Sequence, residues 1–292
     1  MPETFEFTPA ALAQLADDDV TRALHEDVGA GDLTAALVPA DRATHARVVA
    51  RESAVVCGSA WVQAALRRLD PGAQMNWHVA EGQRCTENQL VLEVRGSARA
   101  LLTAERTALN FLQLLSGVAT KTAQYVDIVK GTRAHIVDTR KTLPGLRLAQ
   151  KYAVRCGGGT NHRVGLYDAI LIKENHIAAA GGIAQVMAQA ARLATQANFV
   201  EIEVETLAQL REALDCGARM VLLDNMDLPM LHEAVRINAA TANPAILEIS
   251  GGVTLAGLRA LAETGVDRIS VGTLTKDVRA TDYSMRLNPS LL

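Results

Sequence analysis

Six short apolar runs recur through the second half of this chain, and amphipathic stretches separate them. In chain order, the runs are AHIVD (134–138), AILIK (169–173), FVEIEVE (199–205), RMVLLD (219–224), AILEIS (245–250) and DRISVG (267–272). The intervening stretches, such as TLAQLREALDCG (206–217), carry apolar residues at helical spacing. This alternation is typical of βαβ units and predicts a parallel sheet.

Each of the six runs ends at polar residues or glycines. They are Asp138-Thr139-Arg140, Lys173-Glu174-Asn175, Glu203 and Glu205, Asp224-Asn225, Ser250-Gly251-Gly252 and Gly272-Thr273. Because the carboxyl ends of the strands converge on one mouth of an α/β barrel, these residues predict a site there. The span 134–273 is too short for the eight units of a barrel of about 250 residues. We therefore expect an α/β fold with an open barrel of six or seven parallel strands.

The first 115 residues follow a different pattern. Residues 8–25 form a helix candidate, 43–58 and 75–96 contain strand candidates with tight turns, and 97–117 form a long helix candidate with a leucine-rich face. These elements predict an N-terminal α+β sandwich domain at 1–115, followed by a catalytic barrel domain at 116–274. We expect the C-terminal tail, 275–292, to return to the first domain.

The composition excludes several classes of protein. The 292 residues carry a net charge of −3, which gives no general attraction for nucleic acid. No window approaches about 18 uninterrupted apolar residues, which argues against a membrane span, and the start lacks the pattern of a signal peptide. The four cysteines have no spacing that suits zinc, and they predict reduced thiols in a cytoplasmic protein.

One basic window runs against the overall negative charge. From Arg140 to Lys173 there are seven lysines and arginines and His162, against a single acid, Asp168. Arginine is a planar fork that suits bidentate capture of carboxylate or phosphate, and lysine is a point charge. We expect a small polyanion to bind here.

A solvated basic face is the alternative interpretation of this window. Arg147, Lys151 and Arg155, at four-residue steps, fit that alternative and predict an exposed helix face. Lys173 does not fit it, because it ends the apolar run AILI, where its stem should be largely buried.

The glycines predict two further features. The run at 157–159 matches neither GxGxxG nor a P-loop, so we expect it to let the loop at Asn161 to Arg163 fold over the mouth. The sequences 250–252 and 271–273 follow consecutive late strands, where α/β barrels often hold a phosphate. A tight-turn role alone is the alternative.

Acidic side chains alternate along one predicted strand. Glu201, Glu203 and Glu205 should point the same way. Glu203 and Asp224, each near the end of its own strand, suit hydrogen bonds from a ribose diol or contacts with Mg²⁺, directly or through water. No Ser-His-Asp or Cys-His arrangement stands out.

Taken in order, these motifs resemble the quinolinate phosphoribosyltransferase family. The residues that carry the resemblance are EDVGAGDLT, ERTALN, DTRKTLPGLR, GGGTNHRVGLYDAILIKENH, EIEVE, LLDNM, ISGG and SVGTLT. The resemblance implies that quinolinate and phosphoribosyl diphosphate give nicotinate mononucleotide, diphosphate and CO₂, with Mg²⁺, in de novo NAD synthesis. It also implies an open barrel joined to an N-terminal α/β domain, in a homodimer with sites between subunits.

The resemblance also assigns roles to single residues. Quinolinate would contact Arg140, His162, Arg163 and Lys173, with Thr139 beside them and Arg106 supplied across the subunit interface. Lys141 would face the diphosphate, and Glu203 and Asp224 would hold the ribose hydroxyls or the metal. The 5′-phosphate would lie against Ser250, Gly251, Gly252, Val271, Gly272 and Thr273, with Lys276 as a further contact. Lys141, Lys173, Glu203 and Asp224 are the predicted catalytic residues.

Two other functions fit the same residues. A related barrel phosphoribosyltransferase would act on nicotinate or another aromatic acid, although a mono-acid needs fewer cations than Arg106, Arg140, Arg163 and Lys173 supply. A non-catalytic anion-binding barrel would leave Glu203 without a role.

Overall fold

The computed structural model describes residues 5–287. Residues 1–4 of the predicted first domain and 288–292 of the predicted tail lie outside the described residues. The chain forms two compact units. The barrel unit comprises mainly Gln124–Lys141 and Gly159–Thr273, and the sandwich unit comprises Glu6–Ala123, Thr142–Gly158 and the chain from Leu274 onward. The predicted boundary at 115/116 falls inside one helix, whereas the compact units divide at Ala123/Gln124.

The barrel unit contains a sheet of six parallel strands, as the alternating pattern predicted. The strands are β6 (His135–Val137), β7 (Ile170–Ile172), β8 (Val200–Val204), β9 (Met220–Asp224), β10 (Ile246–Ser250) and β11 (Arg268–Ser270). Their order across the sheet is β6-β11-β10-β9-β8-β7. Each strand lies within one of the six apolar runs, so the α/β open-barrel prediction is confirmed.

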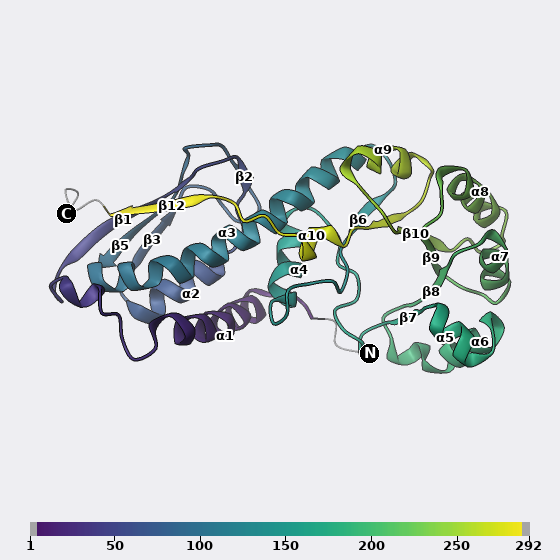
Figure 1. Ribbon diagram of the computed structural model, residues 1–292, viewed down its shortest axis with the longest axis horizontal. Coiled ribbons are helices and arrows are strands. Elements are labelled where there is room, and N and C mark those ends of the chain that lie inside the picture. Colours follow the sequence, from purple (N-terminus) through teal and green to yellow (C-terminus); the bar gives the residue numbers. More distant parts are fainter. Residues whose placement is uncertain (1–4, 288–292) are drawn as a thin grey trace. The chain divides into compact units, whose positions relative to one another are not determined.

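Helices surround the outside of this sheet, as Figure 1 shows. They are α5 (Glu174–Ala180), α6 (Ile183–Leu193), α7 (Leu207–Asp215), α8 (Leu228–Ala239) and α9 (Leu255–Glu263), with a short 3₁₀ turn, η2 (Ala194–Gln196), after α6. Local sequence sets their ends. Thr206 and Gln209 form a capping box at the start of α7, and Gly217 follows the end of that helix with φ +81°.

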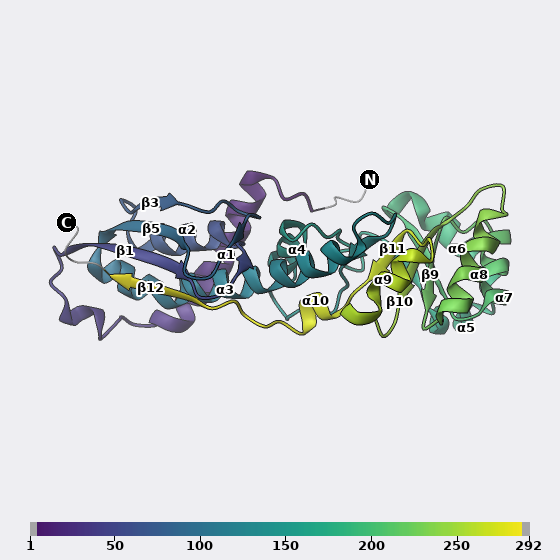
Figure 2. The same ribbon diagram turned by 90° about the horizontal axis from the view of Figure 1, so that it is seen from above.

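The sandwich unit is built on an antiparallel sheet in the order β12-β1-β5-β3. Its strands are β1 (Ala43–Ala50), β3 (Gln74–Trp77), β5 (Leu90–Ser97) and β12 (Tyr283–Leu287), and a separate pair joins β2 (Ala54–Val55) to β4 (Arg84–Cys85). Figures 1 and 2 show β12, near the C-terminal end of the chain, beside β1.

Helices of the sandwich unit cover one face of its four-stranded sheet (Figure 2). They are α1 (Pro9–Val28), α2 (Ser59–Leu69) and the first part of α3 (Ala98–Val129). The helix α4 (Arg147–Cys156) and the short turns η1 (Ala35–Leu37) and α10 (Thr273–Lys276) complete the helical elements. Helix α3 buries its predicted leucine-rich face but continues twelve residues past the predicted end at 117. Helix α2 was not predicted.

One prediction about α4 is wrong. Lys151 is fully buried, whereas Arg155 on the same helix is exposed. The face of α4 that includes Ala149, Ala153 and Val154 packs into the unit, and Lys151 goes with it. The four-residue spacing therefore does not mark an exposed basic face.

No helix within residues 5–287 combines the length and the apolar character that crossing a lipid bilayer requires.

Candidate active site

A cavity of about 330 Å³ lies at the carboxyl ends of the barrel strands. Its lining residues come from all six strand ends and from the loop after residue 160; they are Thr139, Arg140, Lys141, His162, Arg163, Leu171, Lys173, Glu203, Leu222, Ser250 and Ser270. Eight of these eleven were predicted as site residues. The barrel therefore brings half of the sixteen predicted site residues into one lining, which includes four Lys or Arg side chains.

The loop that carries His162 is fixed beside β6 by hydrogen bonds. Val137 and Thr160 form a parallel bridge, and Asp138 accepts hydrogen bonds from the His162 backbone N–H (2.8 Å) and the Asn161 side chain (2.7 Å). The buried Asp138 carboxylate thus fixes the approach to the cavity. His162 is part of the cavity lining, and the expectation that this loop folds over the mouth stays a prediction.

His162 reaches down into a buried acidic pair below the cavity. Its Nε2 lies 2.8 Å from Glu201 Oε2 and 3.7 Å from Glu248 Oε1. The Arg163 backbone N–H donates to His162 Nδ1 at 2.8 Å, which assigns the ring hydrogen to Nε2 and directs it at Glu201. Both ring nitrogens therefore have protein partners. The role of His162 as a direct contact of quinolinate stays a prediction.

Glu201 and Glu248 are both fully buried, and burial raises the pKa of each to about 7. The value for Glu248 includes two opposing effects. Proximity to Glu201 raises its pKa, while His162 and Arg268 lower it. Arg268 Nε lies 2.7 Å from Glu248 Oε2, and the Ser270 hydroxyl donates to Glu248 Oε1. A compact network of charged and polar groups therefore lies below the cavity.

Lys173 and Glu203 form an ion pair at the wall of the cavity. The distance from Lys173 Nζ to Glu203 Oε2 is 3.1 Å. The Lys173 side chain is 45% exposed, so its stem is less buried than predicted. Burial raises the pKa of Glu203, and the hydrogen bond from Lys173 counteracts this. Along β8, exposure increases from buried Glu201 through Glu203 to exposed Glu205, which follows the strand toward the mouth.

Arg140 and Arg163 place two guanidinium groups in the lining. Arg163 is buried and donates from Nη1 to the Ala169 carbonyl at 3.1 Å. Burial first, and then repulsion from Arg140, lowers the pKa of Arg163 from its usual high value. Arg140 Nε is buried and has no hydrogen-bond partner among residues 5–287. A buried donor without a partner is costly, and an anionic ligand would satisfy it.

The ends of β9 and β10 are locked together by one close contact. Asp224 and Ser250 are paired in the sheet, and Asn225 adopts φ +53° and donates its backbone N–H to the Ser250 carbonyl. Gly251 has φ +95°, and a Cβ added there would lie 2.1 Å from Asn225 Oδ1. Glycine is therefore required at 251 by conformation and by space. The sequence 250–252 can therefore form a tight turn and also bind a phosphate, the two roles considered from the sequence.

The end of β11 approaches the loop after β6. A Cβ added at Gly272 would lie 3.2 Å from Lys141 Cδ and 3.6 Å from Thr139 Oγ1. Thr139 Oγ1 accepts the Lys141 backbone N–H at 3.1 Å. Thr273 Oγ1 is buried without a hydrogen-bond partner in the described part of the chain. This corner therefore holds a lysine and an unsatisfied hydroxyl next to a glycine turn.

Several site residues were not predicted. Ser270, Leu171 and Leu222 lie in the lining, and Glu248 and Arg268 lie in the buried network that Ser270 joins below the cavity. The only sequence signal for Glu248 was an acid inside the apolar run AILEIS. Eight predicted residues are not part of this lining. Arg106 and Lys276 belong to the sandwich unit, and the other six belong to the barrel unit: Asp224, Gly251, Gly252, Val271, Gly272 and Thr273.

A larger hollow of about 530 Å³ lies between α1 and α2 of the sandwich unit. Its charged residues are Asp17, Arg67 and Arg68, and Arg68 already pairs with Asp17 at 3.1 Å. It lacks the convergence of cations and acids that the barrel cavity has, so we place the candidate active site in the barrel.

Comparisons with known proteins identify the family of this chain. The C-terminal domain of quinolinate phosphoribosyl transferase matches residues 118–286, and its N-terminal domain matches residues 32–116. A nicotinate-nucleotide pyrophosphorylase [carboxylating] of Mycobacterium leprae is 44% identical over 279 residues, covering 93% of this chain and 97% of the relative. A quinolinate phosphoribosyltransferase [decarboxylating] of Nicotiana tabacum is 37% identical over 289 residues, covering 92% of this chain and 81% of the relative.

A solved structure gives the same result. The nicotinate-nucleotide pyrophosphorylase from Francisella tularensis superimposes with a TM-score of 0.90 at 42% identity, covering 94% of this chain and 97% of that one. The family matches extend over both units and include every motif that carried the resemblance except the first part of EDVGAGDLT, which begins before residue 32. The chain belongs to the quinolinate phosphoribosyltransferase family.

Proposed function

We propose that the barrel cavity transfers the phosphoribosyl group from phosphoribosyl diphosphate to quinolinate, with decarboxylation. The products are nicotinate mononucleotide, diphosphate and CO₂, which makes this a decarboxylating pentosyltransferase of de novo NAD synthesis. The observation that carries the proposal is the convergence of Arg140, Arg163 and Lys173 on one cavity, where Arg140 Nε lacks a partner.

Arg140, Arg163 and Lys173 are the groups we assign to the quinolinate carboxylates. Arginine forks match carboxylates in a bidentate way, and Leu171 and Leu222 offer apolar surface to the pyridine ring. Each hydrogen bond to a charged group contributes about 1.5–3 kcal/mol. Lys173 would exchange its contact with Glu203 for the substrate carboxylate.

The remaining groups suit the phosphorylated sugar. Lys141 would face the diphosphate, and Glu203 and Asp224 would accept hydrogen bonds from the ribose hydroxyls. The turns at 250–252 and 271–273 would receive the 5′-phosphate, where the buried Thr273 hydroxyl is unsatisfied. Lys276 stays a predicted further contact.

Glu203 in the cavity wall and Asp224 at the end of β9 fit Mg²⁺. Glu203 and Asp224 offer only carboxylate oxygens, the ligand type that Mg²⁺ prefers, and repulsion from Asp224 raises the pKa of Glu203, so the two carboxylates lie near one another. When bound, Mg²⁺ would neutralise negative charge on the diphosphate. Glu203 and Asp224 would hold it, directly or through water.

The chemistry then depends mainly on position and charge. Loss of diphosphate from C1′ leaves an oxocarbenium-like centre, and Lys141 would stabilise the departing negative charge. The pyridine nitrogen attacks C1′ and becomes cationic, so the ring can accept the electrons left when the neighbouring carboxylate departs as CO₂. No general base is needed. Arg140 and Arg163 would orient the ring for attack.

Assembly and location complete the proposal. We expect a homodimer in which Arg106, exposed on α3, completes the quinolinate site of the partner subunit. We also expect a cytoplasmic enzyme. The alternative acceptor, nicotinate, lacks the 2-carboxylate that quinolinate loses as CO₂, and the matched relatives are named as carboxylating or decarboxylating enzymes.

An assay with quinolinate labelled at the 2-carboxylate tests the function. With phosphoribosyl diphosphate and Mg²⁺ we expect equal amounts of labelled CO₂, diphosphate and nicotinate mononucleotide. With nicotinate as acceptor we expect no mononucleotide. Turnover of nicotinate at a comparable rate would favour the alternative acceptor, and no turnover of either acid would favour an anion-binding barrel.

A further inference from the structure

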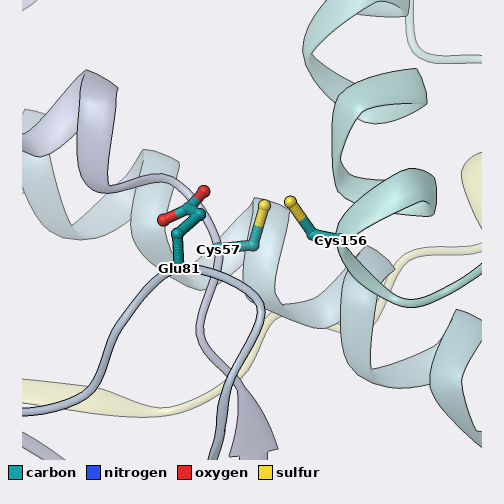
Figure 3. Close-up of side chains that lie close together, drawn as sticks. All are labelled: Cys57, Glu81 and Cys156. Atoms are coloured by element: carbon teal, nitrogen blue, oxygen red, sulfur yellow. The ribbon is translucent and has the colours of Figure 1, made fainter. Parts of the chain in front are cut away.

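Two cysteines and a glutamate meet inside the sandwich unit, far from one another in the sequence (Figure 3). Cys57 follows β2, Glu81 lies in the turn between β3 and β4, and Cys156 is the last residue of α4. One ligand atom from each residue lies within 4.8 Å of the other two. Figure 3 shows the two sulfur atoms directed at each other.

One face of α3 holds both cysteines in place. The Ser116 hydroxyl accepts the Cys57 backbone N–H at 3.0 Å and donates to the Cys57 carbonyl at 3.2 Å. Gly157, next to Cys156, packs so closely that an added Cβ would lie 2.4 Å from the Ala119 carbonyl oxygen and 2.6 Å from Thr122 Cβ. Ser116, Ala119 and Thr122 are three residues apart and share a helix face. The contacts with α3 therefore hold the backbone of both cysteines so that their sulfur atoms lie close together.

The two thiols have different surroundings. Cys57 is fully buried and Cys156 is half-buried. Burial, and next the contacts with Cys156 and Glu81, raise the pKa of Cys57 well above its usual value. Cys57 therefore stays a thiol, and Cys156 is the sulfur that a small reagent from solution reaches first.

Glu81 is oriented beside Cys57 by the start of α2. Its two carboxylate oxygens accept the backbone N–H groups of Gly58 (2.9 Å) and Ser59 (3.0 Å). These bonds and the helix N-terminus stabilise its negative charge, so the cluster needs no cation for charge balance. Two sulfur atoms directed at each other beside a carboxylate that is already satisfied suit a disulfide better than a metal site.

We propose that Cys57 and Cys156 form a disulfide when the protein meets a peroxide, with Glu81 as the proton acceptor. In the first step, the Cys156 sulfur attacks hydrogen peroxide; an S–O bond forms, the O–O bond breaks, and the leaving hydroxide takes the Cys156 thiol proton and departs as water. In the second step, Glu81 takes the Cys57 proton as the Cys57 sulfur attacks Cys156. The S–S bond forms, the S–O bond breaks, and the leaving hydroxide takes the same proton from Glu81 and departs as water. The two thiols lose two electrons and the peroxide gains them.

The bond would join the segment after β2 to the end of α4. A cross-link that closes a long stretch of chain stabilises the fold chiefly by restricting the unfolded state. The oxidised sandwich unit should therefore unfold at a higher temperature than the reduced one. Cys216, half-buried at the end of α7 in the barrel unit, is the matched control for exposure.

Peroxide titration of the reduced full-length protein, followed by digestion with trypsin without reductant, tests the proposal. Trypsin releases Cys57 in ESAVVCGSAWVQAALR (52–67) and Cys156 in CGGGTNHR (156–163). We expect these two peptides joined, with free thiols falling from four to two. We also expect a rise in unfolding temperature that dithiothreitol reverses.

Variants separate this pair from general oxidation. In Cys57→Ala, Cys156 should persist as a sulfenic acid that dimedone labels; in Cys156→Ser, Cys57 should resist peroxide and the unfolding temperature should not rise. Cys216→Ser should form the cross-link as the wild type does. Oxidation of Cys216 before Cys156, a cross-link between other cysteines, or thiols that survive peroxide in the folded wild type would each overturn the proposal.

Discussion

His162 Nε2 lies 2.8 Å from the fully buried carboxylate of Glu201, while His162 Nδ1 accepts the Arg163 backbone N–H. The imidazole is thus held by the Glu201 carboxylate at one ring nitrogen and by the Arg163 backbone at the other. A residue that lines the cavity is positioned by a residue that does not.

Replacing Glu201 tests this support. Glu201→Gln keeps an acceptor for the His162 Nε2–H, so we expect kcat/KM for quinolinate to stay within about threefold of the wild type. Glu201→Ala leaves that hydrogen without a partner in a buried site, at a cost of about 1–3 kcal/mol, and should reduce kcat/KM by tenfold or more. Circular dichroism checks the fold of both variants. Equal activity of the two would show that the contact has no role in catalysis.

The buried acids predict a pH dependence of stability. Burial raises the pKa of Glu248 to about 7 from a model-peptide value of 4.5. Between these values the folded protein binds more protons than the unfolded chain, so the free energy of unfolding falls as pH rises. Glu248→Gln removes this loss, and its stability relative to the wild type should improve between pH 5 and pH 8 by at most about 3 kcal/mol. Urea unfolding at both pH values measures it. A relative stability that does not change with pH would contradict the prediction.

The Lys173–Glu203 pair predicts a link between lysine and metal. Lys173→Met removes the cation that lies 3.1 Å from Glu203, so Glu203 should attract Mg²⁺ more strongly. We expect kcat/KM for quinolinate to fall at least tenfold while the Mg²⁺ concentration for half-maximal rate decreases. The matched control is Lys130→Met, which removes a lysine paired with Asp127 at 2.6 Å. If the Mg²⁺ concentration for half-maximal rate does not change in Lys173→Met, Glu203 does not hold the metal.

Mixed dimers test the proposed contribution of Arg106. A subunit with Arg106→Ala and a subunit with Arg140→Ala would together form one complete site in a mixed dimer. Random mixing makes half of the dimers mixed, so about a quarter of the wild-type activity should return. If no activity returns although mass spectrometry shows mixed dimers, Arg106 acts within its own chain or not at all.

The sequence predicted the barrel sheet well because apolar periodicity records burial directly. Each of the six runs became a strand, and the polar residues after them lie at one end of the sheet. Motifs placed Arg140, Lys173 and Glu203 correctly in one cavity. The pairing of Lys173 with Glu203 was not predictable, because it depends on how adjacent strands are positioned.

Buried charges were the main failure. Lys151 was assigned to an exposed face and is fully buried, and Glu248 went unnoticed inside an apolar run. Spacing gives the face of an element that a residue occupies, but not whether that face is covered. The meeting of Cys57 and Cys156 was equally hidden, because it depends on packing of α4 against α3.

The central claim is that Arg140 binds a carboxylate of quinolinate in the barrel cavity. Isothermal titration of quinolinate into Arg140→Ala tests it most directly, with Arg192→Ala, an exposed arginine on α6, as the matched control. We expect Arg140→Ala to keep its unfolding temperature and to bind quinolinate at least about tenfold more weakly, while Arg192→Ala binds as the wild type does. Wild-type affinity in Arg140→Ala would contradict the account.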